Sequence, residues 1–109
     1  MINIRFDELS ERDIWEAECK GYLCGLKAEI DGKTYLVNVY SIARLQHDFE
    51  YEMECSGYYV PDPNLIIVDT VTPDRIKFTM ENMYKDKYFV SFEGTEGDFY
   101  VFRKRKIFN

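Results

Sequence analysis

Apolar and polar residues alternate on both sides of Asp31-Gly32 in the stretch GYLCGLKAEIDGKTYLVNVYS, residues 21–41. Both central residues of a type I′ turn need positive φ, and Asp-Gly is one of the pairs that favours this turn. The stretch therefore predicts a β-hairpin. Because side chains alternate between the two faces of a strand, the turn places four cross-strand pairs on one largely apolar face. These pairs are Ile30 with Lys33, Ala28 with Tyr35, Leu26 with Val37, and Cys24 with Val39, so Cys24 is expected in the core.

Shorter patterns predict elements near both ends of this hairpin. Residues 2–6 alternate and predict a short strand. Ser10 with Asp13 has the spacing of a helix capping box, with an irregular charged loop as the alternative. The continuous apolar run at residues 65–68 predicts a central strand covered on both faces. Thr72-Pro73 predicts the N-cap and first position of a helix that buries Ile76, Met80 and Met83. Residues 88–93 and 98–104 predict a second hairpin.

The segment between the first hairpin and residue 65 carries the most distinctive charge pattern. Ile42, Leu45 and Phe49 have helical spacing and predict a short helix or turn after Ser41. The following stretch DFEYEMEC, residues 48–55, alternates strictly and predicts a strand or extended edge. Its acidic side chains would form a ladder on one outer face: Asp48, Glu50, Glu52 and Glu54. A tyrosine loop with turn-forming prolines follows, containing Tyr58, Tyr59 and Asp62.

Together these elements predict one α+β domain over residues 1–109. Its sheet is mainly antiparallel with about five to six strands, and one or two helices pack on one face. A chain of 109 residues with 46% hydrophobic residues can bury a core of this size.

The net charge and its distribution along the chain indicate which kinds of partner the protein can bind. The net charge is −6, and residues 1–62 hold 13 of the 20 acidic residues but 6 of the 14 basic ones. An acidic surface disfavours nucleic acid, whose phosphates require positive charge, and suits a basic protein partner. No apolar stretch approaches the length of a membrane span, and the N-terminus is charged too early for a secretory signal. Three irregularly spaced cysteines indicate reduced thiols, so we expect a cytoplasmic protein.

The sequence contains few candidate catalytic residues. His47 is the only histidine and has no serine or cysteine in a recognisable nucleophile motif beside it, which favours a surface role. Cys19 and Cys24 lack the spacing of a zinc site. Asp69 ends a predicted strand, where catalytic carboxylates occur, although the helix cap that follows favours a structural role. We therefore predict no catalytic residue, no cofactor and no metal.

Two segments in order, KTYLVNVYSIARL and NLIIVDTVTPDRIKFTMENMY, resemble the bacterial Immunity protein 8 family. The resemblance covers the middle half of the chain and consists of a strand, a leucine-containing turn at Leu45, an apolar strand and a capped helix. It implies a cytosolic inhibitor that binds a cognate toxin domain and has no catalysis of its own.

Three hypotheses follow. The first is an immunity protein that binds a basic toxin domain of a contact-dependent or polymorphic toxin system. The second is a small structural or regulatory α+β domain, with dimerisation through an exposed hairpin edge as one form. The third is a small enzyme that uses Asp69 and nearby carboxylates. On the first hypothesis, which we favour, tyrosines would anchor the interface and carboxylates would steer the encounter. Its predicted contact residues are Asp48, Glu50, Glu52, Glu54, Tyr58, Tyr59 and Asp62.

Overall fold

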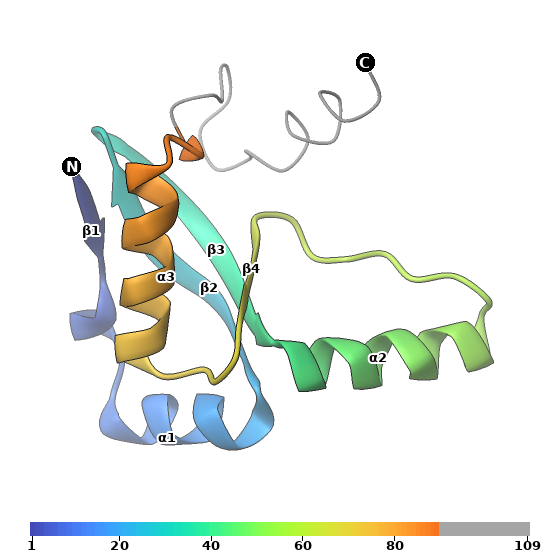
Figure 1. Ribbon diagram of the computed structural model, residues 1–109. Helices are drawn as coiled ribbons and strands as arrows, with labels where there is room; N and C mark the ends of the chain where they lie inside the picture. The colour runs from blue at the N-terminus through green and yellow to red at the C-terminus, as the bar shows by residue number, and fades with distance from the viewer. Residues whose placement is uncertain (90–109) are drawn as a thin grey trace, which may run out of the picture.

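Four strands form one mixed sheet in the order β1-β2-β3-β4 in the computed structural model, which describes residues 1–89 (Figure 1). β1 pairs antiparallel with β2, β2 pairs antiparallel with β3, and β4 runs parallel to β3. The strands are β1 (Ile2–Ile4), β2 (Tyr22–Ile30), β3 (Lys33–Ser41) and β4 (Leu65–Val68). The helices are a 3₁₀ turn (Phe6–Glu8), α1 (Glu11–Lys20), α2 (Ile42–Cys55) and α3 (Pro73–Lys85).

The predicted class, an α+β domain with a mostly antiparallel sheet, is confirmed, while the described part has four strands and three α-helices rather than five to six strands and one or two helices. The second predicted hairpin lies, from residue 90 onward, outside the described residues. The capping box at Ser10 is confirmed, because its side chain accepts from the Asp13 N–H and the Asp13 carboxylate accepts from the Ser10 N–H. Thr72 and Pro73 begin α3 as predicted.

The first hairpin has the predicted register next to its turn. Ile30 faces Lys33, Ala28 faces Tyr35 and Leu26 faces Val37. Asp31 and Gly32 both have positive φ, 51° and 85°, as a type I′ turn requires. Turn chemistry and apolar pattern therefore agree over this half of the hairpin.

The predicted pairing of Cys24 with Val39 is wrong. Val39 pairs with Leu23 instead, because the register shifts between Leu23 and Leu26. Gly25 lies in this irregularity with φ of 74°, a conformation that glycine adopts without strain. The extra residue turns Cys24 out of the core, and its side chain is exposed.

The core lies between one face of the sheet and helices α1 and α3. Figure 1 shows α3 lying across the sheet and α1 at one end of it. The predicted stripe of α3 is confirmed, since Ile76 and Met80 are buried and Met83 packs partly buried against them. The sheet contributes most of the remaining buried apolar side chains: Leu26, Ala28, Ile30, Tyr35, Val37, Val39, Ile66 and Val68.

The prediction that β4 is central and covered on both faces is wrong. In the described sheet β4 is the outer strand. Ile66 and Val68 point into the core, whereas Ile67 between them is 46% exposed. A continuous apolar run does not reveal which of its two faces is covered, because that depends on neighbours distant in the sequence.

The strand predicted at residues 48–55 is also wrong, because these residues continue α2 without interruption. The Ser41 side chain caps α2 by accepting from the Arg44 N–H at 3.2 Å. Parallel strands need a crossover connection, and α2 begins the one that links β3 to β4. Glutamate and methionine are good helix formers, so alternation alone did not decide between the two structures. α2 projects away from the sheet, and residues 56–64 return from its far end to β4 (Figure 1).

Candidate partner-binding site

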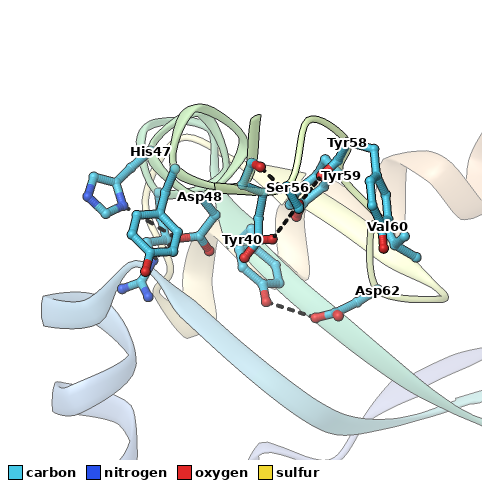
Figure 2. A pocket seen from close by; sticks show the side chains of 11 residues that line it. Tyr40, His47, Asp48, Ser56, Tyr58, Tyr59, Val60 and Asp62 are labelled. Atoms are coloured by element: carbon cyan, nitrogen blue, oxygen red, sulfur yellow. Dashed lines mark hydrogen bonds and ion pairs between the residues drawn. The ribbon is translucent and has the colours of Figure 1, made fainter. Parts of the chain in front are cut away.

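A recess of about 750 Å³ opens between α2, the returning segment 56–64 and the end of β3 (Figure 2). We call it the acidic pocket, because its lining includes three carboxylates against one guanidinium. It also contains four tyrosines. The side chains that define it here are Tyr40, Arg44, Asp48, Tyr51, Glu52, Tyr58, Tyr59 and Asp62, with His47, Ser56 and Val60 completing the lining.

Five of the seven predicted contact residues line this pocket: Asp48, Glu52, Tyr58, Tyr59 and Asp62. The other two, Glu50 and Glu54, do not. A helix advances about 100° per residue, so Glu52 lies about 40° from Asp48 around α2, whereas Glu50 lies about 160° away. The prediction that the four acidic residues form a ladder on one face is therefore wrong. The helix divides the four acids into one pair beside the tyrosine loop and one pair on the opposite side.

The sequence interpretation missed Tyr40, Arg44 and Tyr51. The positions 44, 48 and 51 recur at helical spacing, so extending the predicted helix from Ser41 through residue 55 would have brought them together. Tyr40 belongs to β3, and only the crossover back to β4 places it opposite Asp62. No local pattern in the sequence indicates that contact.

Arg44 is held on one wall of the pocket by several partners. Its Nε donates to Asp48 Oδ1 at 2.9 Å, and a terminal nitrogen donates to the Lys20 carbonyl at 3.0 Å. Its guanidinium carbon lies 4.7 Å from the centre of the Tyr22 ring, which stacks on Tyr40 at 5.7 Å. Arg44 therefore neutralises Asp48 in large part, and Glu52 and Asp62 supply the remaining negative charge of the pocket.

Asp62 ties the returning segment to the sheet. The Tyr40 hydroxyl donates to Asp62 Oδ2 at 2.8 Å (Figure 2), and the Cys24 thiol lies 3.8 Å from the same oxygen. Burial, followed by this hydrogen bond to a carboxylate, raises the pKa of Tyr40. Partial desolvation, the largest cause, likewise raises the pKa of the Cys24 thiol. Both groups therefore stay protonated at neutral pH.

All three carboxylates of the pocket influence the pKa of Tyr59. Burial raises its pKa first, and the charges of Asp48, Asp62 and Glu52 raise it further. The ring of Tyr59 meets Phe49 edge to face, with 5.9 Å between the ring centres. Tyr59 is thus a neutral, half-buried phenol in a negative environment. Negative charge beside aromatic rings is an environment that attracts the guanidinium or ammonium group of a partner.

The other candidate residues occupy separate surroundings. Asp69 is exposed and accepts from Arg75 Nε at 2.9 Å and from the Thr70 N–H at 2.8 Å. Arg75 and then the Thr70 N–H hold its pKa below the usual range. His47 is exposed at the rim of the acidic pocket, 3.4 Å from Asp48 Oδ1. Cys19, Cys24 and Cys55 are free thiols. Within residues 1–89, no His, Cys, Asp and Glu side chains gather in a group of three or more that could hold a metal ion.

Comparison of the chain with protein-family models, with curated proteins and with solved structures finds no match. The resemblance to the Immunity protein 8 family therefore stays a prediction. Among the helices of the described part, α2 included, none has the length and apolar character needed to span a bilayer.

Proposed function

We propose that this chain is a non-catalytic immunity protein of the cytoplasm, which binds and neutralises the toxin domain of a contact-dependent or polymorphic toxin system. The observation that carries the proposal is the acidic pocket, where three carboxylates and four tyrosines line one recess. Tyrosine is enriched in the centres of protein interfaces, because it offers a large apolar surface and a hydroxyl at low entropic cost. The family resemblance supplies the class of partner, a toxin domain.

A basic partner surface complements this site. Glu52 and Asp62 leave the pocket negative after Arg44 has paired with Asp48. Complementary charge accelerates encounter, and buried aromatic anchors slow dissociation. The two kinds of residue should therefore have separable kinetic effects.

The test uses the toxin domain encoded next to the gene for this chain. Glu52→Lys changes the charge of the pocket by two units. At about 10 Å in water this is worth about 0.8 kcal/mol, or about fourfold in association rate before screening. Tyr59→Ala should accelerate dissociation by about 30-fold, which corresponds to a loss of about 2 kcal/mol. Stopped-flow or surface-plasmon kinetics at two salt concentrations measures both.

Glu50→Lys is the matched control, since it makes the same charge change on the opposite side of α2. We expect it to alter association clearly less than Glu52→Lys does. Equal effects of the two variants would place the interface elsewhere. If the unaltered chain neither binds the toxin domain nor restores growth of cells that express it, the immunity proposal is wrong.

A second candidate function is a small structural or regulatory domain that dimerises. The observation in its favour is the exposed apolar side of α2, where Ile42, Phe49 and Met53 all remain accessible. Sedimentation equilibrium of the purified chain distinguishes this candidate, because it requires a dimer in the absence of any other protein.

A further inference from the structure

A second recess, which we call the apolar groove, lies on the other flank of α2. It has a volume of about 310 Å³ and is lined mainly by Ile42, Leu45, Phe49, Tyr59, Pro61 and Leu65. Although it is apolar, the helix that forms one wall has no buried residue at all. Phe49 is 48% exposed and Ile42 is 55% exposed. Large contiguous apolar patches on a protein surface mark interaction sites, whereas scattered apolar side chains do not.

Tyr59 joins the two recesses, since it lines both the acidic pocket and the apolar groove. Its ring contacts Phe49 on the groove side, and three carboxylates influence its hydroxyl on the pocket side. The recesses are therefore separated by the thickness of one side chain. Two groups that occupied them together would be immediate neighbours on the partner, as side chains three or four positions apart on a helix are.

We infer that the apolar groove seats a large apolar side chain of a partner segment whose neighbouring lysine or arginine enters the acidic pocket. This deepens the proposed function, on which it rests, by stating what the bound segment of the toxin domain presents. The charge argues for this occupant. A cation next to the apolar side chain would lie near Glu52 and Asp62. It would also interact favourably with the faces of the tyrosine rings that line the pocket. The apolar side chain covers Phe49 and Leu45, which water otherwise contacts.

The same charge argues against a second copy of the chain as occupant. Each copy has a net charge of −6, with 13 acidic residues among its first 62. A symmetric contact across α2 would bring the acidic pockets of both copies close to each other, and like charges across an interface disfavour association.

The test is independent of the toxin. A random linear peptide library displayed on phage is selected on the full-length chain, with an unrelated acidic protein as background, and the enriched peptide is synthesised for calorimetry. We expect enriched sequences to combine lysine or arginine with a large apolar residue within one helical turn. Phe49→Ala should raise the dissociation constant of the peptide by about tenfold or more, as loss of an anchor residue does. Glu52→Gln should weaken peptide binding severalfold, and this effect should be larger at low salt, where charges are less screened.

Each variant has a matched control. Phe78→Ala removes an equally large ring from α3, where Phe78 is 53% exposed and belongs to neither recess. Glu54→Gln removes a carboxylate from α2 that lines neither recess. Both controls should bind the peptide as the unaltered chain does, and circular dichroism should show all four variants folded.

Three results would overturn the inference. Selection could yield no enrichment above background, or peptides without a basic residue. Phe49→Ala and Glu52→Gln could bind as their controls do. Sedimentation could reveal a dimer that Phe49→Ala abolishes, in which case a second copy fills the groove. Failure of the toxin domain to bind, while peptides still bind as described, would refute the proposed function and leave only the pairing of an apolar with a basic side chain, on some other partner.

Discussion

The two adjacent isoleucines of β4 should differ sharply in their contribution to stability. Ile66 is 1% exposed and packs in the core, whereas Ile67 is 46% exposed. Substitution by alanine removes the same three carbon atoms at both positions. At about 0.8 kcal/mol for each buried carbon, Ile66→Ala loses about 2.4 kcal/mol of transfer free energy, and the cavity raises the cost to about 3–4 kcal/mol. Ile67→Ala loses about half of the transfer free energy and leaves no enclosed cavity, so we expect about 1 kcal/mol.

Urea titration followed by far-ultraviolet circular dichroism measures the difference. With an m value of about 1–2 kcal/mol/M, a gap of about 2 kcal/mol separates the two unfolding midpoints by about 1–2 M urea. Both variants should retain the m value of the unaltered chain, because neither changes the surface exposed on unfolding. If Ile66→Ala does not fold, Ile66→Val at about 1 kcal/mol against an undetectable effect of Ile67→Val gives the same comparison.

The opposite order would refute the assignment of the two faces of β4. Equal and large losses would mean that β4 is covered on both sides, as the continuous apolar run first predicted. Equal and small losses would mean that β4 does not belong to the core at all.

Three further predictions concern single positions. Gly21 ends α1 with φ of 83°, and a Cβ there would lie 2.9 Å from side-chain atoms of the α2 cap and first turn. Gly21→Ala should therefore destabilise the chain by about 1–3 kcal/mol more than Gly32→Ala, which meets only the backbone strain of its φ of 85°; similar urea midpoints would contradict the clash. The lowered pKa of Asp69 beside Arg75 stabilises the fold above the unfolded-state pKa of about 3.9, so the stability gap between the unaltered chain and Asp69→Asn should close as the pH falls through the folded-state pKa; a gap that persists at lower pH would rule out this linkage. His47→Ala should leave the free energy of unfolding within about 0.5 kcal/mol, because the side chain is exposed; a larger loss in the same titration would show a structural role.

The sequence predicted those elements whose signals are local. The Asp31-Gly32 turn, the Ser10 capping box and the Thr72-Pro73 helix start each depend on a few consecutive residues and on backbone preferences that tertiary contacts do not override. Near the Asp31-Gly32 turn the register followed as well, because the apolar face and the turn agreed. The bulge at Gly25 ended that agreement, since an extra residue in one strand is not visible in an alternating pattern.

The second half of α2, residues 48–55, was predicted as a strand, whereas the helical spacing of Ile42, Leu45 and Phe49 correctly indicated its first half; no residue of α2 is buried. Burial against a core is what forces apolar residues of a helix into a repeat of 3.6, and a helix without it can carry apolar residues at alternate positions. Residues 48–55 do so. Five of the seven predicted contact residues nevertheless share one recess, because the tyrosine loop folds back along the same helix.

The topology explains why the candidate site lies at this place. β4 runs parallel to β3, so the chain must travel from the end of β3 back to the level at which β4 begins. It leaves along α2 and returns through residues 56–64, which line the same recesses as the helix. The returning leg is fastened to the sheet, since the Asn38 side chain donates to the Pro63 carbonyl at 2.8 Å and the buried Asn64 side chain donates to the Leu36 carbonyl at 3.0 Å. The recesses therefore have one wall anchored to the core and one wall, α2, that has no buried residue. A surface built in this way presents aromatic and acidic side chains at some distance from the core, where a partner can cover both flanks of the helix without disturbing the sheet.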